Sequence, residues 1–318
     1  MKKTNWAVLL FLCCGFFNIC CIHHPKVEEH KNIDSISTTA GSSSKYPFLY
    51  DLDHPSQKLK LPDALTEISG MDVYKDAELV CNQDEKGNVY LYDVNKGELD
   101  KRIPFAKDGD YEGIANVNDT IYVLKSDGKL YQLINFNKQD QKTVVIKTFL
   151  QKENNTEGLC FDKKNYRLLI ACKSDPGAGL KNVRAIYSFD LKTKQLLQKP
   201  VFTISLDSIK RYIAKVSPAE FTAEELRDII DAKKGDVAFQ PSDLAIHPIS
   251  GDIYVIATVG KLMVILHPDG TIAFIKQFSA TEFKQPEGIT FLNDGTMFIS
   301  DEGRNGLGNI LKFNYQSK

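Results

Sequence analysis

The segment QPEGITFLNDGTMFISDEG, residues 285–303, contains a pattern that this chain repeats. A Glu-Gly pair opens a short apolar run, Asn-Asp-Gly follows, and a second apolar run ends in acidic residues. Related phrases are EISGM from Glu67, YEGIA from Tyr111, TEGLC from Thr156 and PSDLAI from Pro241. Short apolar runs separated by Gly, Asn and Asp are typical of β-strands joined by tight turns.

The copies recur at a nearly constant spacing. The residue before the Gly, or its equivalent, is Ser69, Glu112, Glu157, Ser242 and Glu287, at intervals of 43, 45, 85 and 45 residues. Units of about 45 residues with three or four short strands are typical of β-propeller blades. The double interval contains no further Glu-Gly opener, so we interpret it as one enlarged blade. The sequence therefore predicts an all-β fold, a five-bladed β-propeller.

Two features complete this prediction. In SPAEFTAEELRDIIDAKKG, Ser217 is suited to cap a helix and Gly235 to end it, which predicts a helical insert near residues 217–234. The last unit supplies only three strands, and the N-terminal segment YPFLYDLDHPSQKLKLP can add the fourth. Closure of the last blade by this N-terminal strand removes the open sheet edge at the seam.

Composition sets limits on partners. Among 318 residues, 40 are basic and 41 acidic, so the total charge suggests no polyanionic partner. We expect a monomer that does not bind nucleic acid. With 42% hydrophobic and 25% charged residues, the composition is ordinary for a folded protein.

The N-terminus has the features of an export signal. Two lysines precede the apolar run WAVLLFLCCGFF, and Cys20 and Cys21 lie at its end. We expect residues 1–21 to be a lipoprotein leader with Cys20 or Cys21 lipidated, although Phe17-Asn18-Ile19 does not match the usual lipobox. An ordinary cleaved signal peptide is the alternative.

The polar residues 22–45 predict a flexible tether, which leaves 46–318 as the propeller domain. The expected location is the bacterial cell envelope, with a lipid anchor in the membrane.

The repeated glutamates predict a common site. The first strand of each blade lines the central channel of a propeller, so Glu112, Glu157 and Glu287 should converge. Glu67, two residues before Ser69, lies on the same strand face. Asp243 follows Ser242, the residue that aligns with the glutamates, so it points elsewhere unless the strand is bulged.

Converging carboxylates repel one another unless a cation or protons compensate them. Oxygen ligands without a His/Cys cluster favour Ca²⁺ over Zn²⁺. The alternative is that the glutamates accept hydrogen bonds from backbone N–H groups and only link the blades.

The ends of the second strands give another candidate set. These residues lie next to polar loops and are expected either to form a pocket rim for an anionic ligand or to be solvated turn residues. They are Asn82, Lys125, Lys173 and Asp301, with Arg304 in the following Gly-rich loop.

The phrases EISGM, YEGIA, TEGLC, QPSDLAIHPISGDIYVIAT and QPEGITF resemble the SdiA-regulated (YjiK-like) proteins, five-bladed propellers distantly related to NHL-repeat proteins. The resemblance covers roughly residues 47–315. It implies a bound calcium ion in the propeller and a cell-envelope location.

Two functions remain open on these grounds. One is a calcium-binding propeller that acts as a binding module for a small ligand or an envelope protein. The other is a metal-dependent hydrolase of the lactonase or phytase-like esterase type that uses the channel metal.

Overall fold

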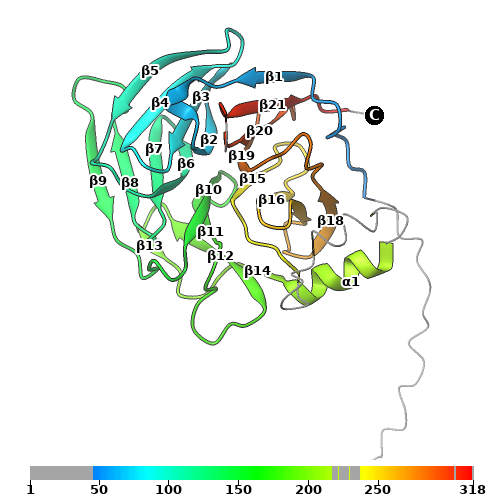
Figure 1. The fold of residues 1–318 in the computed structure, drawn as a ribbon. Helices are drawn as coiled ribbons and strands as arrows, with labels where there is room; N and C mark the ends of the chain where they lie inside the picture. The colour runs from blue at the N-terminus through cyan, green and yellow to red at the C-terminus, as the bar shows by residue number, and fades with distance from the viewer. Residues whose placement is uncertain (1–45, 217–220, 222–228, 230–236, 304–305, 317–318) are drawn as a thin grey trace, which may run out of the picture. The chain divides into compact units, whose positions relative to one another are not determined.

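Five antiparallel sheets surround a central axis in the computed structural model (Figure 1). The structure describes residues 46–216, 221, 229, 237–303 and 306–316. In these residues the sheets are β2–β5 (blade 1), β6–β9 (blade 2), β10–β14 (blade 3), β15–β18 (blade 4) and β19–β21 with β1 (blade 5). The prediction of a five-bladed β-propeller is confirmed.

The innermost strands are those that the repeated phrase opens. They contact one another in a closed ring, in the order β2, β6, β10, β15, β19 and back to β2. Their bounds are β2 (Ile68–Lys75), β6 (Tyr111–Val117), β10 (Thr156–Asp162), β15 (Asp243–Ile246) and β19 (Pro286–Phe291).

The next two strands of each blade carry the core. The second strands are β3 (Glu78–Gln83), β7 (Thr120–Lys125), β11 (Arg167–Cys172), β16 (Ile253–Ala257) and β20 (Met297–Asp301). The third strands are β4 (Asn88–Asp93), β8 (Leu130–Ile134), β12 (Val183–Asp190), β17 (Leu262–Leu266) and β21 (Asn309–Phe313). All five residues of β16 and of β17 are buried, because each sheet packs against a neighbouring sheet on both faces.

The outer strands are more exposed, as the alternation in their sequences requires. They are β5 (Glu98–Pro104), β9 (Lys142–Ile146), β13 (Gln195–Leu196), β14 (Phe202–Ser205), β18 (Ile272–Gln277) and β1 (Gln57–Lys60).

The N-terminal strand closes the ring as predicted. β1 pairs antiparallel with β21, with Gln57 opposite Lys312 and Lys60 opposite Asn309. A 3-10 turn, η1 (Asp63–Leu65), then leads into blade 1. Blade 5 therefore combines strands from both ends of the propeller domain, and β1 supplies its fourth, outer strand.

Glycines allow the inner strands to approach closely. A Cβ on Gly113 would lie 2.7 Å from the Glu157 carbonyl oxygen, and one on Gly158 would lie 3.0 Å from Asp243 Cα. A Cβ on Gly70 would lie 3.2 Å from Gly113 Cα. These contacts run between neighbouring blades, so the Gly after the repeated Glu is needed for the width of the ring.

One described helix lies directly before the predicted helical insert. A helix that the sequence did not predict, α1 (Leu206–Val216), directly follows β14 and contacts β18. Its buried residues, Leu206, Ile209 and Ile213, follow the spacing of one helix face. The insert predicted near residues 217–234 lies outside the described residues except for Phe221 and Ile229, which are both buried.

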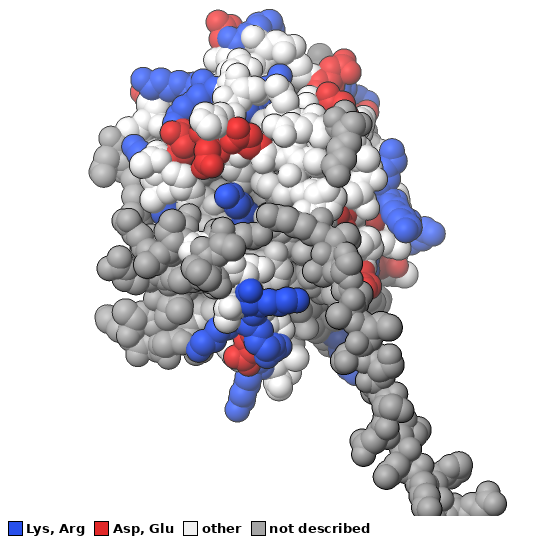
Figure 2. All heavy atoms as spheres, turned by 90° about the vertical axis from the view of Figure 1, so that its right-hand side faces the viewer, with Lys and Arg blue, Asp and Glu red and all other residues white. Residues whose placement is uncertain are grey.

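The leader (1–21), the tether (22–45), Cys20 and Cys21 also lie outside the described residues. Within the described part of the chain, no helix is long and apolar enough to cross a membrane. Figure 2 shows charged side chains of both signs spread over one face with uncharged side chains between them.

Candidate functional site

The four repeated glutamates line one small cavity at an end of the central channel. Its volume is about 300 Å³, and its walls come from the starts of the innermost strands and the ends of the second strands. We call it the acidic site. Its ionisable residues are Glu67, Asp84, Glu112, Glu157, Glu287, Glu302 and Lys173, and Ser69, Thr258 and Gln285 add neutral polar groups.

A β-bulge directs three of these glutamates to the axis. In each case the register of the first two strands skips the glutamate, with shifts between Tyr111 and Gly113, between Thr156 and Leu159, and between Pro286 and Gly288. A bulge adds one residue to one strand and changes the direction of its side chain. The Glu-Gly pair is therefore the sequence signal for a bulge, which the sequence analysis did not recognise.

Lys173 supplies the positive charge of the acidic site. Its Nζ lies 3.1 Å from Glu157 Oε1, and Asn155 Nδ2 donates to the same oxygen over 2.8 Å. Burial alone would lower the pKa of Lys173, but Glu157, Glu287 and Glu112 raise it above its usual value. Lys173 is therefore a permanent cation among the carboxyl groups.

One ammonium group does not compensate all the carboxyl groups. Burial, the charge of Glu157 and that of Asp110 raise the pKa of Glu112 to about 10. Burial raises the pKa of Glu287 to about 8 and, with Glu67 nearby, that of Asp84 to about 6. Without a further cation, part of the acidic site is therefore neutralised by protons.

The donor chemistry of the acidic site suits a hard cation such as Ca²⁺, because the ligands are carboxylate oxygens. The side-chain positions do not form a coordination shell. Among the described residues, no three His, Cys, Asp or Glu side chains are grouped closely enough to hold a metal ion. The Lys173 ammonium instead contacts Glu157 directly. No reaction step can be derived through a metal in this arrangement.

Asp243 does not line the acidic site. β15 and β16 pair without a bulge, so Asp243 takes the position that Gly has in the other blades. Its Oδ1 accepts from the Leu159 N–H over 3.3 Å, and its Oδ2 accepts from the Ile289 N–H over 2.9 Å. Asp243 therefore links blade 4 to blades 3 and 5.

The residues predicted as a pocket rim are not found together. Asn82 and Asp301 are buried and do not lie on a rim: Asn82 Nδ2 donates to the Tyr111 carbonyl, and Asp301 accepts from the Lys284 and Gln285 N–H groups. Lys125 pairs with Asp127 and lines another cavity. Arg304 lies outside the described residues. Of the four described members of this set, Lys173 alone lines the acidic site.

Asp84 and Glu302 were not among the predicted residues, because the ends of the second strands are offset by one or two residues from the positions that the sequence alignment of the blades gives. In the structure the Asp84 N–H donates to the Glu67 carbonyl, the Lys173 N–H to Asn155 and the Glu302 N–H to Gln285. Asp84, Lys173 and Glu302 are thus structurally equivalent. Bulges shift the alignment between blades, and the acidic loops NQDEKG and SDEG were the only available signal.

The chain matches a family model described as a domain of unknown function (DUF4221) over residues 51–233, which is more than half of its length. The chain belongs to the DUF4221 family. For this DUF4221 chain, a search of curated proteins finds no match.

Solved structures share the fold at low sequence identity. The glutaminyl cyclase of Myxococcus xanthus is 13% identical, with 83% of this chain and 96% of that chain covered and a TM-score of 0.52. A gluconolactonase of Xanthomonas campestris is 12% identical, with coverages of 81% and 80% and a TM-score of 0.47. A Bacteroides thetaiotaomicron protein of unknown function is 15% identical, with coverages of 77% and 55% and a TM-score of 0.47. Similarity at this level concerns the fold alone.

Proposed function

We propose that the protein is a cation-binding propeller of the cell envelope, with Ca²⁺ as the expected ion at the acidic site. The observation that carries the proposal is the excess of carboxyl groups: six acidic residues and a single lysine line a cavity of about 300 Å³. Several like charges in so small a cavity are stable together only when cations or protons compensate them.

The glutamates of the acidic site also retain free acceptor capacity. Within the described residues, no backbone N–H donates to Glu67, Glu112, Glu157 or Glu287. The contacts of Glu157 and Glu287 come from the side chains of Asn155, Lys173 and Thr258. Ca²⁺ accepts six to eight oxygens in a flexible geometry. Binding therefore requires these side chains to rotate toward the ion rather than the backbone to move.

Calorimetric titration of the purified chain with CaCl₂ tests the proposal. We expect binding, and we expect Glu157→Gln and Glu287→Gln each to weaken it at least tenfold, because each removes a charged ligand. Glu98→Gln, on the exposed start of β5, is the matched control and should bind as the wild type does. No heat of binding at millimolar calcium, or equal binding by all three variants, would refute the proposal.

The variant Lys173→Met distinguishes two interpretations of the acidic site: a site for a metal ion, or a site whose charge Lys173 alone compensates. If Ca²⁺ and the ammonium group compete for the same carboxylates, this variant binds calcium about tenfold more tightly, since removal of one like charge nearby is worth about 1–2 kcal/mol. If Lys173 is instead the only cation that the acidic site accommodates, the variant loses stability and gains no calcium affinity.

The proposed location rests on the resemblance to SdiA-regulated proteins and on the leader sequence, and the proposed role as a binding module rests on the rigid ring, whose loops are free to carry binding residues. We propose that a lipid on Cys20 or Cys21 anchors it in the envelope, where the propeller binds a small ligand or an envelope protein. Mass spectrometry of the mature N-terminus tests the anchor.

The hydrolytic alternative can be tested with the same variants. A panel of lactones and phosphoesters is assayed with calcium for the wild type and for Glu157→Gln. Turnover that the variant loses while its fold is retained would favour a hydrolase over a binding module.

A further inference from the structure

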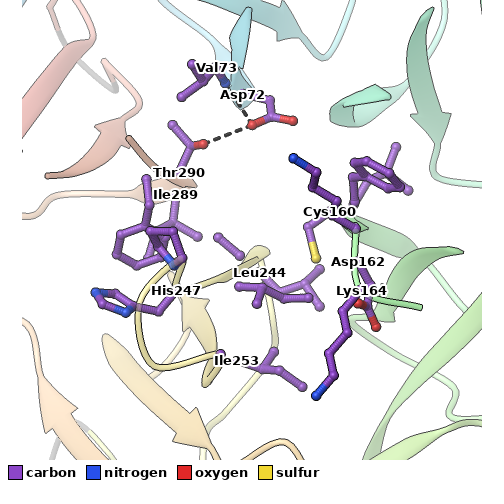
Figure 3. Close-up of a pocket in the computed structure, with 18 of the residues that line it drawn as sticks. Asp72, Val73, Cys160, Asp162, Lys164, Leu244, His247, Ile253, Ile289 and Thr290 are labelled. Carbon is purple, nitrogen blue, oxygen red and sulfur yellow. Dashed lines mark hydrogen bonds between the residues drawn. The ribbon is translucent and has the colours of Figure 1, made fainter. Parts of the chain in front are cut away.

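The other end of the central channel opens into a much larger cavity, of about 1140 Å³. All five blades contribute to its wall, and it shares no lining residue with the acidic site. Figure 3 shows Asp72, Cys160, Leu244, Ile253 and Ile289, which belong to four blades, around a common space. The volume is slightly above the range of about 300–1,000 Å³ that is typical of small-molecule sites. We call it the apolar cavity.

The walls of the apolar cavity are mostly apolar on the side of blades 3 and 4. Phe161 and Phe202 are only partly buried although they are aromatic, and Ile249 at the edge is 56% exposed. Ile246 at the end of β15 is half-buried and continues this surface, whereas Leu244 and Ile253 behind it belong to the buried core. Exposed apolar side chains that gather at one concave site favour an apolar ligand, whereas scattered ones do not.

The rim of the same side is positively charged. Arg167 Nε donates to Asp162 Oδ2 over 2.7 Å and so compensates the one acidic side chain among the described rim residues. The guanidinium group of Arg167 also lies 5.7 Å from the centre of the Phe202 ring. Lys163 and Lys164, in the turn between β10 and β11, are exposed and pair with no acidic side chain of the described residues. The rim therefore carries an excess of two positive charges next to an aromatic wall.

The floor of the apolar cavity has the opposite charge. Asp72 lies deep in the channel, where it accepts from the Asn116 N–H over 2.8 Å. It also accepts from Thr290 Oγ1 over 3.0 Å (Figure 3). An anionic group is repelled from this depth and attracted to the rim. A ligand with an apolar part and one acidic group therefore enters with the apolar part first.

We propose that the apolar cavity binds a single-chain anionic amphiphile, whose apolar chain packs against the half-buried Phe161, Phe202 and Ile246. Its carboxylate or phosphate group lies at Lys163, Lys164 and Arg167. This site is separate from the acidic site and does not depend on the cation proposed there.

Titration calorimetry of the purified chain with dodecanoate, below its micelle concentration, tests the proposal. We expect dodecanoate to bind at least tenfold more tightly than dodecyltrimethylammonium, which has the same chain and the opposite charge. Each added methylene between octanoate and dodecanoate should strengthen binding about threefold to fourfold, which corresponds to the transfer free energy of one buried CH₂. Equal binding of the anion and the cation, or affinity that does not change with chain length, would overturn it.

The rim is tested by the double variant Lys163→Glu/Lys164→Glu, whose residues are exposed in a turn and do not support the core. We expect dodecanoate binding to weaken about tenfold or more, with a smaller loss at high salt. Lys138→Glu/Lys192→Glu, in exposed turns away from the cavity, is the matched control and should bind normally. Dodecanoate binding that the rim variant leaves unchanged would contradict the proposal.

Flotation with phosphatidylglycerol vesicles separates a free amphiphile from a bilayer surface. We expect no association through the cavity, because it encloses one chain rather than a membrane. The contrary result is that Lys138→Glu/Lys192→Glu floats with the vesicles, that Lys163→Glu/Lys164→Glu does not, and that dodecanoate fails to bind. In that case the cavity rim contacts a membrane and the proposal is wrong.

Discussion

Both ends of the central channel contain buried or half-buried carboxyl groups, but different donors satisfy them. At the acidic end, Glu157 and Glu287 contact side chains only. Farther along the channel, Asp72 and Asp243 accept hydrogen bonds from backbone N–H groups of neighbouring blades. The number of acids at one place therefore does not reveal their role, whereas the origin of their hydrogen bonds does.

The two aspartates together link all five blades. Asp243 of blade 4 accepts from blades 3 and 5, while Asp72 of blade 1 accepts from Asn116 of blade 2 and Thr290 of blade 5. A buried carboxylate that is satisfied by fixed N–H groups stabilises one arrangement of those groups. The linking role that the sequence offered as an alternative for the glutamates belongs to these aspartates.

The largest expected effect tests this distinction directly. Asp243→Ala removes the acceptor of two buried N–H groups, so we expect the free energy of unfolding to fall by about 2–4 kcal/mol, with Asp243→Asn intermediate. Glu287→Gln, at the acidic end, should change it by less than about 1 kcal/mol, because no N–H loses its acceptor. Urea denaturation followed by circular dichroism measures both. If Asp243→Ala is as stable as the wild type, the comparison fails.

A smaller effect is expected for the glycines of the innermost strands, which lie along the channel between the two ends and pack against neighbouring blades. A Cβ on Gly113 meets the Glu157 carbonyl at 2.7 Å, so Gly113→Ala must move backbone and should lower the free energy of unfolding by about 1–3 kcal/mol. A Cβ on Gly288 meets Ser300 Oγ at 2.5 Å, and this hydroxyl, which has no partner in the described residues, can turn away. We expect Gly288→Ala to cost less than about 1 kcal/mol. Equal losses in the two variants, measured by the same denaturation, would show that the ring is uniformly deformable.

The smallest effect is a pH dependence at the wall of the apolar cavity. His247 Nδ1 accepts from the Ser250 N–H, so the ring proton of the neutral form is on Nε2, which donates to Tyr50 Oη, and Tyr50 donates to the Gly295 carbonyl. Burial lowers the pKa of His247 from 6.5, against the opposing effect of Asp252.

A lowered folded-state pKa means that the unfolded chain takes up the proton first. The stability that His247 contributes is therefore complete above pH 6.5 and is lost as the pH falls below that value, by about 1.4 kcal/mol per unit of lowering. We expect His247→Gln to lose less stability between pH 7.5 and pH 5.0 than the wild type does. Parallel pH profiles for the two proteins would exclude His247 as the titrating group.

Much of the architecture could be predicted from the sequence because the blade is a local unit. The spacing of Glu112 and Glu157, and the turn in the segment 285–303, repeat within about 45 residues, and each unit forms its own sheet. The closing strand was predictable because the last unit lacked one. The helix α1 was missed because its short amphipathic run continues the apolar stretch of β14. Ser205 caps the helix, since its Oγ accepts from the Ser208 N–H over 3.3 Å, but the same residue also ends the strand.

The candidate site was predictable only in part. The convergence of the glutamates follows from the repeat. The place of Lys173 among them does not, because the Glu-Gly pair was not recognised as a bulge, which changes the register by one residue. Asp243 was expected to point away from the other acids unless its strand is bulged, and its unbulged strand does place it outside the acidic site.

The sequence by itself determined the number of blades, their order and the residue types at the axis, since these depend on local periodicity and composition. Only the tertiary structure decided which carboxyl groups face a cavity and which accept backbone hydrogen bonds. The physical reason is that donors from other blades, such as the Ile289 N–H for Asp243, lie far away in the chain and come within reach only when the ring closes.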